Sequence, residues 1–374
     1  MRLLSFLVSL SLLAATSCAT KPVFMRPASN HTAGTSRRHF GRVIGGNDAG
    51  QGQYPFAVFL MIREGDQTAF CGGSIISNRW ILTAGHCVVD INSGGNSLNV
   101  SIPITKNKSH TGRTISKRKY PTVKAKDIRV GVGNIYNARS APYHVSKVYV
   151  HPNLNLDYFD NDIALIKLKK KLKFSNTVQP IKIDTDSIPD GLTVTGVGWG
   201  KTSLDSQSTA NILQTVDLRT GNTELCQRVR PEFDSNNGNY ICVTTPDGRD
   251  TCSGDSGGPL LRRCNADLAQ SGSTGSGPWV QLGITSYGDN AGRDTRVICA
   301  ADDGAGFYTH VARYLDYIKK TTGIKEQDLA ATCNGNELVA ARSSHAPSSA
   351  RQPPARTLLY STAVLLVATL TFII

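Results

Sequence analysis

The sequence has few long apolar stretches with helical periodicity and no internal repeat, which argues against a helical bundle and against a solenoid. In their place, short runs rich in Val, Ile and Leu recur between turn residues. Regularly spaced runs of this kind are typical of a β-sandwich or β-barrel, so we expect an all-β body. The runs are 56–62, 80–83, 128–132, 145–150, 163–168, 192–197, 212–218 and 280–285.

One helix is predicted at the end of this body. Val311, Tyr314, Leu315 and Ile318 lie at i, i+3, i+4 and i+7, which gives the segment a single apolar stripe. The stripe stops before Gly323, and we expect the compact domain to end at that glycine.

Cysteine pairs with C-x-x-C spacing are absent, so the pattern typical of a structural zinc site is missing. The chain has nine cysteines, and removal of a leader that contains Cys18 would leave eight. An even number of cysteines in a secreted protein is expected to pair in disulfides. The sequence also has no recognised nucleic-acid-binding motif, so its net charge of +13 does not predict a nucleic-acid partner.

The N-terminus has the layout of a secretory signal peptide, over residues 1–19. Met1-Arg2 precedes an apolar run, 3–13, and a small-residue stretch follows and ends at 17–19. A lipoprotein leader with a lipidated Cys18 is the alternative, although the leucine expected before such a cysteine is missing.

The C-terminus has the parts of a GPI-attachment signal. A polar stalk, 324–356, contains small residues at 343–344 and 348–350, and a hydrophobic tail, 357–374, follows it. In such signals the tail is removed and a lipid anchors the protein to the membrane. A retained membrane helix is the alternative, although the tail barely spans a hydrocarbon core of about 30 Å. We therefore expect an extracellular protein that is anchored to the cell surface.

Three N-x-Ser/Thr sequons, at Asn30, Asn99 and Asn107, fit a secreted glycoprotein. The last two lie in the segment 91–126, which contains basic residues and no acidic residue. A solvated loop is the plainest interpretation of this segment. Attraction to a polyanion is the sharper hypothesis.

Three further segments carry residues suited to nucleophilic catalysis. His86 follows a strand-like run in 83–87, Asp162 opens another in 160–165, and Ser256 lies in the glycine-rich turn 252–259. A serine hydroxyl is a weak nucleophile at neutral pH and needs an adjacent base, which in turn needs a third group to fix its tautomer. The sequence supplies one candidate for each role, in the order His, Asp, Ser.

With these segments and the start Val43-Ile44-Gly45-Gly46, the chain resembles the trypsin branch of the chymotrypsin-like serine peptidases over residues 43–323. The resemblance implies two packed six-stranded Greek-key β-barrels, an active site in the cleft between them, and a C-terminal helix. It also implies a serine endopeptidase that acts on proteins or peptides and needs no metal or organic cofactor. Calcium, which binds some relatives, cannot be inferred from these residues.

The resemblance implies a role for each motif residue. Ser256 would attack the scissile carbonyl, His86 would take and return its proton, and Asp162 would orient His86. The backbone N–H groups of Gly254 and Ser256 would form the oxyanion hole.

Activation is expected at the Arg42–Val43 bond. Residues 20–42 are polar and basic and end in Gly41-Arg42, so they fit a pro-segment; a plain linker is the alternative. By the resemblance, cleavage frees the Val43 ammonium, which pairs with Asp255 and orders the turn that carries Ser256. Burial of either charge demands the pair.

Specificity rests on Asp250, six residues before Ser256, where relatives place the floor of the primary pocket. A carboxylate there pairs with a substrate Arg or Lys, so the enzyme would cleave after these residues and would cut its own Arg42–Val43 bond. A turn residue is the alternative interpretation of Asp250. The other residues implied to line the pocket are Ser286, Tyr287, Gly288 and Gly306.

Three disulfides follow from the resemblance: Cys71–Cys87, Cys226–Cys242 and Cys252–Cys299. Cys264 and Cys333 are left over, and we expect them to pair, without support from the family.

The chain departs from the family in four places. Gly85 stands where alanine is usual before the catalytic His, and Tyr287 replaces the commoner Trp. The loop between Gly288 and Cys299 is longer than usual, and the stretch between His86 and Asp162 is longer by the basic segment 91–126. Two alternatives from other classes remain: a catalytically inactive homologue that acts as a binding protein, and an enzyme whose main role is adhesion through that basic segment.

Overall fold

The computed structural model describes residues 44–90, 97–98, 117–118, 120–203, 205–206, 208–245, 248–264, 277–290, 299–301 and 303–333. Several predictions lie outside these residues: the leader, the pro-segment with Arg42 and Val43, the three sequons, most of the segment 91–126, and the chain beyond Cys333. No helix of the described part is both long enough and apolar enough to cross a membrane.

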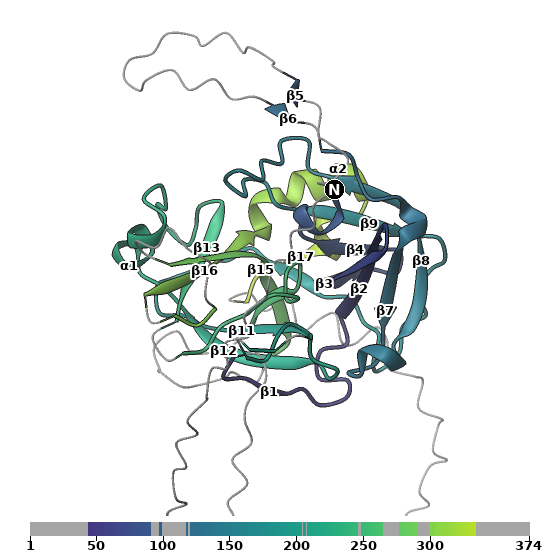
Figure 1. Cartoon of the computed structure of the whole chain (residues 1–374), viewed down its shortest axis with the longest axis horizontal. Helices are drawn as coiled ribbons and strands as arrows, with labels where there is room; N and C mark the ends of the chain where they lie inside the picture. The colour runs from purple at the N-terminus through teal and green to yellow at the C-terminus, as the bar shows by residue number, and fades with distance from the viewer. Residues whose placement is uncertain are drawn as a thin grey trace, which may run out of the picture. The chain divides into compact units, whose positions relative to one another are not determined.

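Six antiparallel strands close into a first barrel in the order β2–β3–β4–β9–β8–β7 (Figure 1). Their bounds are Ala57–Glu64 for β2, Gln67–Ser77 for β3, Trp80–Thr83 for β4, Ile128–Val132 for β7, Ala141–Val150 for β8 and Ala164–Leu168 for β9. Successive side chains of a strand point to opposite faces. Accordingly Val58, Leu60 and Ile62 are fully buried in the barrel while Met61 between them is exposed.

A second barrel has the order β14–β11–β12–β13–β16–β15, and β14 also pairs with β15, which closes it. Its strands are β11 Thr193–Gly198, β12 Gln214–Thr220, β13 Tyr240–Thr244, β14 Pro259–Arg263, β15 Trp279–Asn290 and β16 Gly304–His310. The expected all-β fold of two six-stranded barrels is therefore confirmed. All eight runs selected in the sequence overlap strands.

Five short strands lie outside the two barrels. β1, Asn47–Asp48, pairs with β12, and β5, Ser97–Leu98, pairs with β6, Lys117–Arg118. β10, Lys182–Asp184, runs parallel to both β15 and β17, Ala330–Ala331.

The expected C-terminal helix is present, but its first turn is a 3-10 helix. η4, Val311–Tyr314, continues into α2, Leu315–Thr322. Gly323 ends α2 with a φ of 74°, a left-handed conformation that glycine adopts without strain, and its N–H donates to the carbonyl of Lys319. The remaining helical turns are η1 His86–Val88, η2 Ala125–Asp127, η3 Asn137–Arg139, α1 Thr223–Val229 and α3 Glu326–Leu329.

Packed structure continues past Gly323 as far as Cys333. Leu329 of α3 is fully buried, and β17 adds a strand beside β10. Cys333 forms a disulfide with Cys264, which confirms the pairing expected for the two leftover cysteines. The first ten residues of the segment assigned to a polar stalk thus form part of the domain.

The other three disulfides, Cys71–Cys87, Cys226–Cys242 and Cys252–Cys299, match the pairs that the resemblance implies. The Cys71–Cys87 bond fixes η1 to β3. The Cys252–Cys299 bond closes a loop of 47 residues around β14 and β15. Cross-links of this kind stabilise a fold mainly by restricting the unfolded chain, by about 2–4 kcal/mol each.

Candidate active site

The candidate residues come from the facing edges of the two barrels. His86 opens η1 directly after β4, and Asp162 lies two residues before β9, so the first barrel supplies both. Ser256 lies in the turn 252–258 that precedes β14 of the second barrel. The N–H of Gly72 in β3 donates to the Ser256 carbonyl at 2.7 Å, which ties this turn to the first barrel.

Asp162 is fully buried and accepts hydrogen bonds from both barrels. Its Oδ2 lies 2.7 Å from Nδ1 of His86, and its Oδ1 accepts the His86 backbone N–H at 2.8 Å. From the second barrel, Ser286 Oγ donates to Oδ2, and Thr309 Oγ1 donates to the Asp162 carbonyl at 2.9 Å. A carboxylate held in this way fixes the orientation of the imidazole and stabilises its charged form.

The two groups shift each other's pKa. Burial alone would raise the pKa of the Asp162 carboxyl, but the charge of His86 and the hydrogen bonds from His86 and Ser286 hold it below its ordinary value. Burial alone would lower the pKa of His86, but the charge of Asp162 and its hydrogen bond outweigh burial and raise it. Opposite shifts of this kind are typical of a base paired with an orienting carboxylate.

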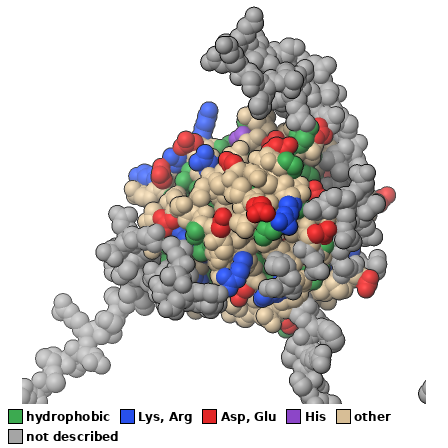
Figure 2. All heavy atoms as spheres, turned by 90° about the vertical axis from the view of Figure 1, so that its left-hand side faces the viewer, with side chains coloured by type: hydrophobic (Ala, Val, Ile, Leu, Met, Phe, Trp, Pro, Cys, Tyr) green, Lys and Arg blue, Asp and Glu red, His purple; other side chains and the backbone are tan. Residues whose placement is uncertain are grey.

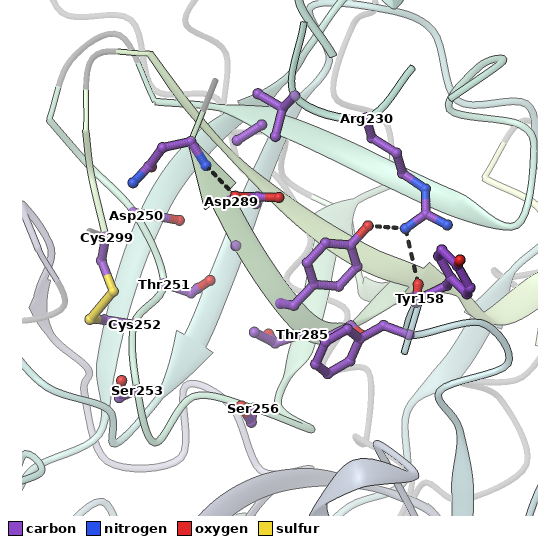
Figure 3. Close-up of a pocket in the computed structure, with 18 of the residues that line it drawn as sticks. Tyr158, Arg230, Asp250, Thr251, Cys252, Ser253, Ser256, Thr285, Asp289 and Cys299 are labelled. Atoms are coloured by element: carbon purple, nitrogen blue, oxygen red, sulfur yellow. Dashed lines mark hydrogen bonds between the residues drawn. A yellow bond between two sulfur atoms is a disulfide. The ribbon is translucent and has the colours of Figure 1, made fainter. Parts of the chain in front are cut away.

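Ser256 lines a cavity of about 620 Å³ that Figure 3 shows from within. Among the described residues no hydrogen bond joins Ser256 Oγ to His86 Nε2, which lies 3.7 Å from Cys87 Sγ. In enzymes without substrate, such nucleophile–base contacts are commonly long and shorten when the substrate binds.

Gly254 has a φ of 101°, which a residue with a side chain rarely adopts. A Cβ atom at this position would lie 2.8 Å from Thr209 Cγ2 and 3.0 Å from Gly200 Cα. Glycine is therefore required by both conformation and space. Because the Gly254 N–H belongs to the turn that carries Ser256, it can donate to an oxygen held in front of that serine.

Asp250 lies in the same cavity and is almost fully buried, with 6% of its surface exposed. Its Oδ2 accepts the N–H of Ala300 at 3.0 Å, whereas its Oδ1 has no hydrogen-bond partner. Burial raises the pKa of the Asp250 carboxyl to about 7, against the opposing effect of the backbone N–H groups of Ala300 and Thr251. A buried acceptor left unpaired is costly, and a cation that entered the cavity would relieve that cost.

The residues predicted to wall the primary pocket line this cavity. Gly288 and Gly306 are direct partners across β15 and β16, and both line the cavity. A Cβ atom on Gly306 would lie 3.4 Å from Asp250 Oδ1, so a larger side chain would fill the space beside the carboxylate. Ser286 and Tyr287 also line the cavity, and the Cys252–Cys299 disulfide borders it (Figure 3).

Asp255 is the third buried carboxylate of the site. It accepts the N–H of Gly200 at 2.7 Å and the N–H of Cys252 at 2.9 Å, and no cationic group of the described chain pairs with it. Burial raises the pKa of the Asp255 carboxyl to about 6, against these two hydrogen bonds. Ile44, at the start of the described chain, lies close to the segment that carries Asp250 and Asp255, because its carbonyl accepts the N–H of Asp250 at 3.2 Å.

Sequence reasoning missed Arg230, which ends α1 and lies at the far end of the cavity. Its guanidinium donates to the Tyr158 carbonyl at 3.1 Å, to Asp160 Oδ1 at 3.2 Å and to the Tyr240 hydroxyl at 3.2 Å. It also donates to the hydroxyl of Tyr287, and Figure 3 shows the bond to Tyr158. Burial raises the pKa of Tyr287 to about 12, so its hydroxyl stays protonated.

Arg230 explains why tyrosine can replace tryptophan at position 287. The Tyr287 ring stacks between Phe159, at 4.8 Å, and Phe307, at 5.1 Å, and its hydroxyl needs a polar partner that Arg230 provides. Phe159 in turn packs edge-on against His86 at 5.9 Å. The tyrosine replacement was visible in the sequence, but nothing local to it pointed to an arginine 57 residues away.

Two groups bring three potential metal-binding atoms within 4.8 Å, namely Cys71, His86 and Cys87, and Asp184, Asp186 and Cys333. Every cysteine in them is in a disulfide and offers no thiolate. In the second group, Arg262 already pairs with both aspartates. Neither group has the ligands of a zinc site.

Comparison with known proteins gives a consistent result. The family model described as Trypsin matches residues 43–318. The chain is 31% identical over 290 residues to CLIP domain-containing serine protease B4 of Anopheles gambiae, which covers 74% of this chain and 69% of that protein. It is 27% identical over 296 residues to mannan-binding lectin serine protease 1 of Rattus norvegicus, which covers 78% of this chain but only 36% of that longer protein.

Replacing Arg230 tests the network that it holds together. Arg230→Ala removes one donor from each of four acceptors and leaves Asp160 with only the Tyr240 hydroxyl, so we expect a loss of roughly 1–3 kcal/mol in the free energy of unfolding. Arg230→Lys should recover little of this loss, because one ammonium cannot reach all four acceptors as a guanidinium does. Urea unfolding of the purified variants measures both values.

The matched control is Arg228→Ala on the same helix, whose exposed ion pair with Glu224 should contribute no more than about 0.5 kcal/mol. Equal losses for Arg228→Ala and Arg230→Ala would show that the network contributes nothing beyond an ordinary surface arginine.

Proposed function

This chain belongs to the trypsin family of serine proteases, and from that premise we propose that it is an endopeptidase that hydrolyses peptide bonds following Arg or Lys. The observation that carries the specificity is the unpaired Oδ1 of Asp250, buried at the base of a slot walled by Gly288 and Gly306. A guanidinium or ammonium group is the ligand that such a carboxylate accepts most favourably. The long stem of Arg or Lys suits a slot without side chains on its walls.

The proposed reaction begins when the substrate cation enters this slot and its carbonyl comes to rest in front of Ser256. Ser256 Oγ attacks the carbonyl carbon while its proton passes to Nε2 of His86. Asp162 holds Nδ1 of His86 as a donor and stabilises the imidazolium that results. The tetrahedral oxyanion accepts the N–H groups of Gly254 and Ser256, an interaction whose loss costs on the order of 3 kcal/mol.

The second half of the reaction returns the enzyme to its starting state. The imidazolium gives its proton to the leaving amine, the C–N bond breaks, and an acyl ester remains on Ser256. Water then attacks the ester carbonyl as His86 accepts a proton from it. The bond between the carbonyl carbon and Ser256 Oγ breaks as His86 returns that proton to Oγ, and the acid product leaves. No step in this sequence needs a metal or an organic cofactor.

We further propose that the chain is a zymogen that is activated by cleavage at Arg42–Val43. Asp255 supports this, because a buried carboxylate that has only backbone donors is an incomplete site for an ammonium group. The Ile44 carbonyl bonded to Asp250 places the start of the described chain beside the turn 252–258. A freed Val43 ammonium would complete the pair and hold Gly254 and Ser256 in place.

We also propose that the protein is extracellular. Four disulfides fit an oxidising, extracellular compartment. We expect residues 1–19 to direct secretion, the three sequons to be glycosylated, and the C-terminus to receive a GPI anchor. The protein would then contact the membrane only through that anchor.

Hydrolysis of matched peptides that differ only in Arg, Lys, Phe or Ala before the scissile bond tests the proposed specificity. We expect strong preference for Arg and Lys, and loss of nearly all activity in Ser256→Ala. Asp250→Ser should lower kcat/KM for the Arg peptide by at least about 10²-fold and leave the Phe peptide almost unchanged, because only the cation meets the carboxylate.

Two results would contradict parts of this proposal. Activity on Phe or Ala peptides alone would agree with Ser256 as the nucleophile but contradict the role of Asp250 in binding a substrate cation. No hydrolysis of any peptide by protein that begins at Val43 would favour the catalytically inactive homologue.

The pH dependence of kcat tests His86 as the base. Only neutral His86 accepts a proton, and Asp162 raises the pKa of His86 above its ordinary value, so kcat should be lost at mildly acid pH and rise through a pKa above about 6.5. For Arg peptides, KM should also fall as pH rises, because Asp250 must lose its proton to pair with the cation. Steady-state kinetics between about pH 5 and pH 9 separate the two effects; a flat kcat profile would argue against His86.

Replacing the residue before the cleaved bond tests activation. Arg42→Gln should prevent processing at this position by a protease of the same specificity and leave the protein inactive on Arg peptides. Arg38→Gln, which removes the same charge four residues earlier, is the control and should be processed and active. Restored activity of a chain cut at an inserted site for an unrelated protease, leaving Val43 first, would show that the new N-terminus is what matters; full activity of uncut Arg42→Gln would rule out the zymogen.

A further inference from the structure

The outer side of the first barrel carries a dense group of lysines on β8, on β9 and on the loop that follows β9. We call it the lysine surface, and it consists of Lys147, Lys167, Lys169, Lys170, Lys171 and Lys173. The segments that form it, 141–156 and 163–183, contain no Asp and no Glu. None of the six lysines forms an ion pair with a residue that the structure describes.

The strand pairing places two of these lysines side by side. Lys147 of β8 and Lys167 of β9 are direct partners in the antiparallel ladder, so their side chains leave the same face of the barrel. Like charges in such a pair repel each other. Each ammonium lies over an aromatic ring, Lys147 over Tyr149 at 4.7 Å and Lys167 over Trp80 at 5.3 Å, which offsets part of the repulsion.

The other four lysines are displayed on a loop whose backbone is held in place. Leu168 N–H donates to the Arg79 carbonyl at 2.9 Å, Lys169 N–H to the His144 carbonyl at 2.9 Å, and Leu172 N–H to the Asn78 carbonyl at 2.6 Å. The Leu172 side chain is buried, whereas the lysines on both sides of it are exposed. A ligand would therefore meet cations already arranged, without the entropic cost of ordering a loop.

The lysine surface is separate from the cavity that holds Asp250 and Ser256. β9 starts two residues after Asp162 and leads away from it, and Ala164 and Leu168 are roughly 13 Å apart at about 3.3 Å per residue. In Figure 1, β8 lies on the side of the first barrel away from β11 and β12. The opposite face, which carries α1, shows acidic and basic side chains interspersed (Figure 2). That face therefore differs from the segments 141–156 and 163–183, which carry cations and no acids.

We propose that the lysine surface binds a sulfated polysaccharide while the catalytic cavity stays open. Six exposed or half-exposed ammonium groups spread over two strands and a loop match an extended chain of repeated anionic groups better than they match a single phosphate, which is usually held by converging backbone N–H groups. An anionic bilayer is the competing partner, since Phe174 beside Lys173 is 46% exposed. The surface offers only this one exposed large apolar side chain for insertion, so we favour the polysaccharide.

The test uses heparin as the probe and the complete secreted protein. We expect a variant with Lys169→Gln, Lys170→Gln, Lys171→Gln and Lys173→Gln to elute from a heparin column at clearly lower NaCl than the native protein, with a Kd for heparin at least about tenfold weaker at 0.15 M NaCl. The same four positions changed to Arg keep the charge and should keep the binding, which also shows that the loop tolerates substitution.

The matched control removes four exposed cations outside both the lysine surface and the segment 91–126: Arg63→Gln, Arg228→Gln, Arg313→Gln and Lys325→Gln. It has the same net charge as the first variant and should elute close to the native protein. Equal losses of heparin binding in both variants would show that only the net charge matters and would overturn the proposal. Native-like heparin binding by the first variant would overturn it as well. Loss of binding to phosphatidylserine vesicles with heparin binding intact would assign the surface to a membrane instead.

This proposal does not depend on peptidase activity, because binding is read directly. If the protein is active, hydrolysis of small Arg peptides should be the same in the native protein and in the first variant, since the lysines lie away from the cavity. Failure of heparin binding with normal hydrolysis would reject the lysine surface alone, and failure of hydrolysis with normal binding would reject the proposed function alone.

Discussion

The buried Asp162 carboxylate is the group on which the arrangement of the two barrels depends. An ionised carboxylate without solvent is stable only when hydrogen bonds satisfy it, and here the donors come from both halves of the molecule. His86 provides two from the first barrel, and Ser286 provides one from the second. A shift of one barrel against the other would leave a buried charge unsatisfied, so the interaction that orients His86 also fixes the width of the cleft.

The three buried carboxylates of the site differ in where their positive partner comes from. Asp162 has His86 within the fold, and its pKa is lowered. Asp250 and Asp255 have only backbone donors, and burial raises their pKa values to about 7 and about 6. Asp250 and Asp255 therefore lack a positively charged partner among the described residues. We propose that a substrate cation supplies this charge at Asp250 and that the new N-terminus supplies it at Asp255. The same cost of burial can then favour substrate binding at one position and activation at the other.

Much of the fold and the candidate site could be predicted because the evidence for them is local. The short apolar run 56–62, bounded by turn residues, predicts a strand, and the glycine-rich sequence around Ser256 predicts a tight turn. The missed elements lack such local patterns. In β3, Gly72 and Gly73 interrupt the apolar residues of the strand, and Gly72 is explained only by the backbone of Gly258, 2.8 Å from where its Cβ would lie. Arg230, Asp160 and Tyr240 are separated by up to 80 residues, and only the packing of the two barrels against each other brings them together.

β9 shows how one short strand can serve two surfaces without conflict. Its beginning adjoins Asp162, where small displacements of the carboxylate would disturb the orientation of His86. Its end leads into the loop 169–173, where the backbone is held by Asn78 and Arg79 and the lysine side chains are exposed to solvent. Between them, Ala164, Leu165 and Ile166 are completely buried, so the strand is fixed by packing against the barrel rather than by its charged end. Exposed charges on a rigid strand end can therefore be gained or lost at little cost to the fold, which is the condition under which a second binding surface can arise beside a geometrically demanding cleft.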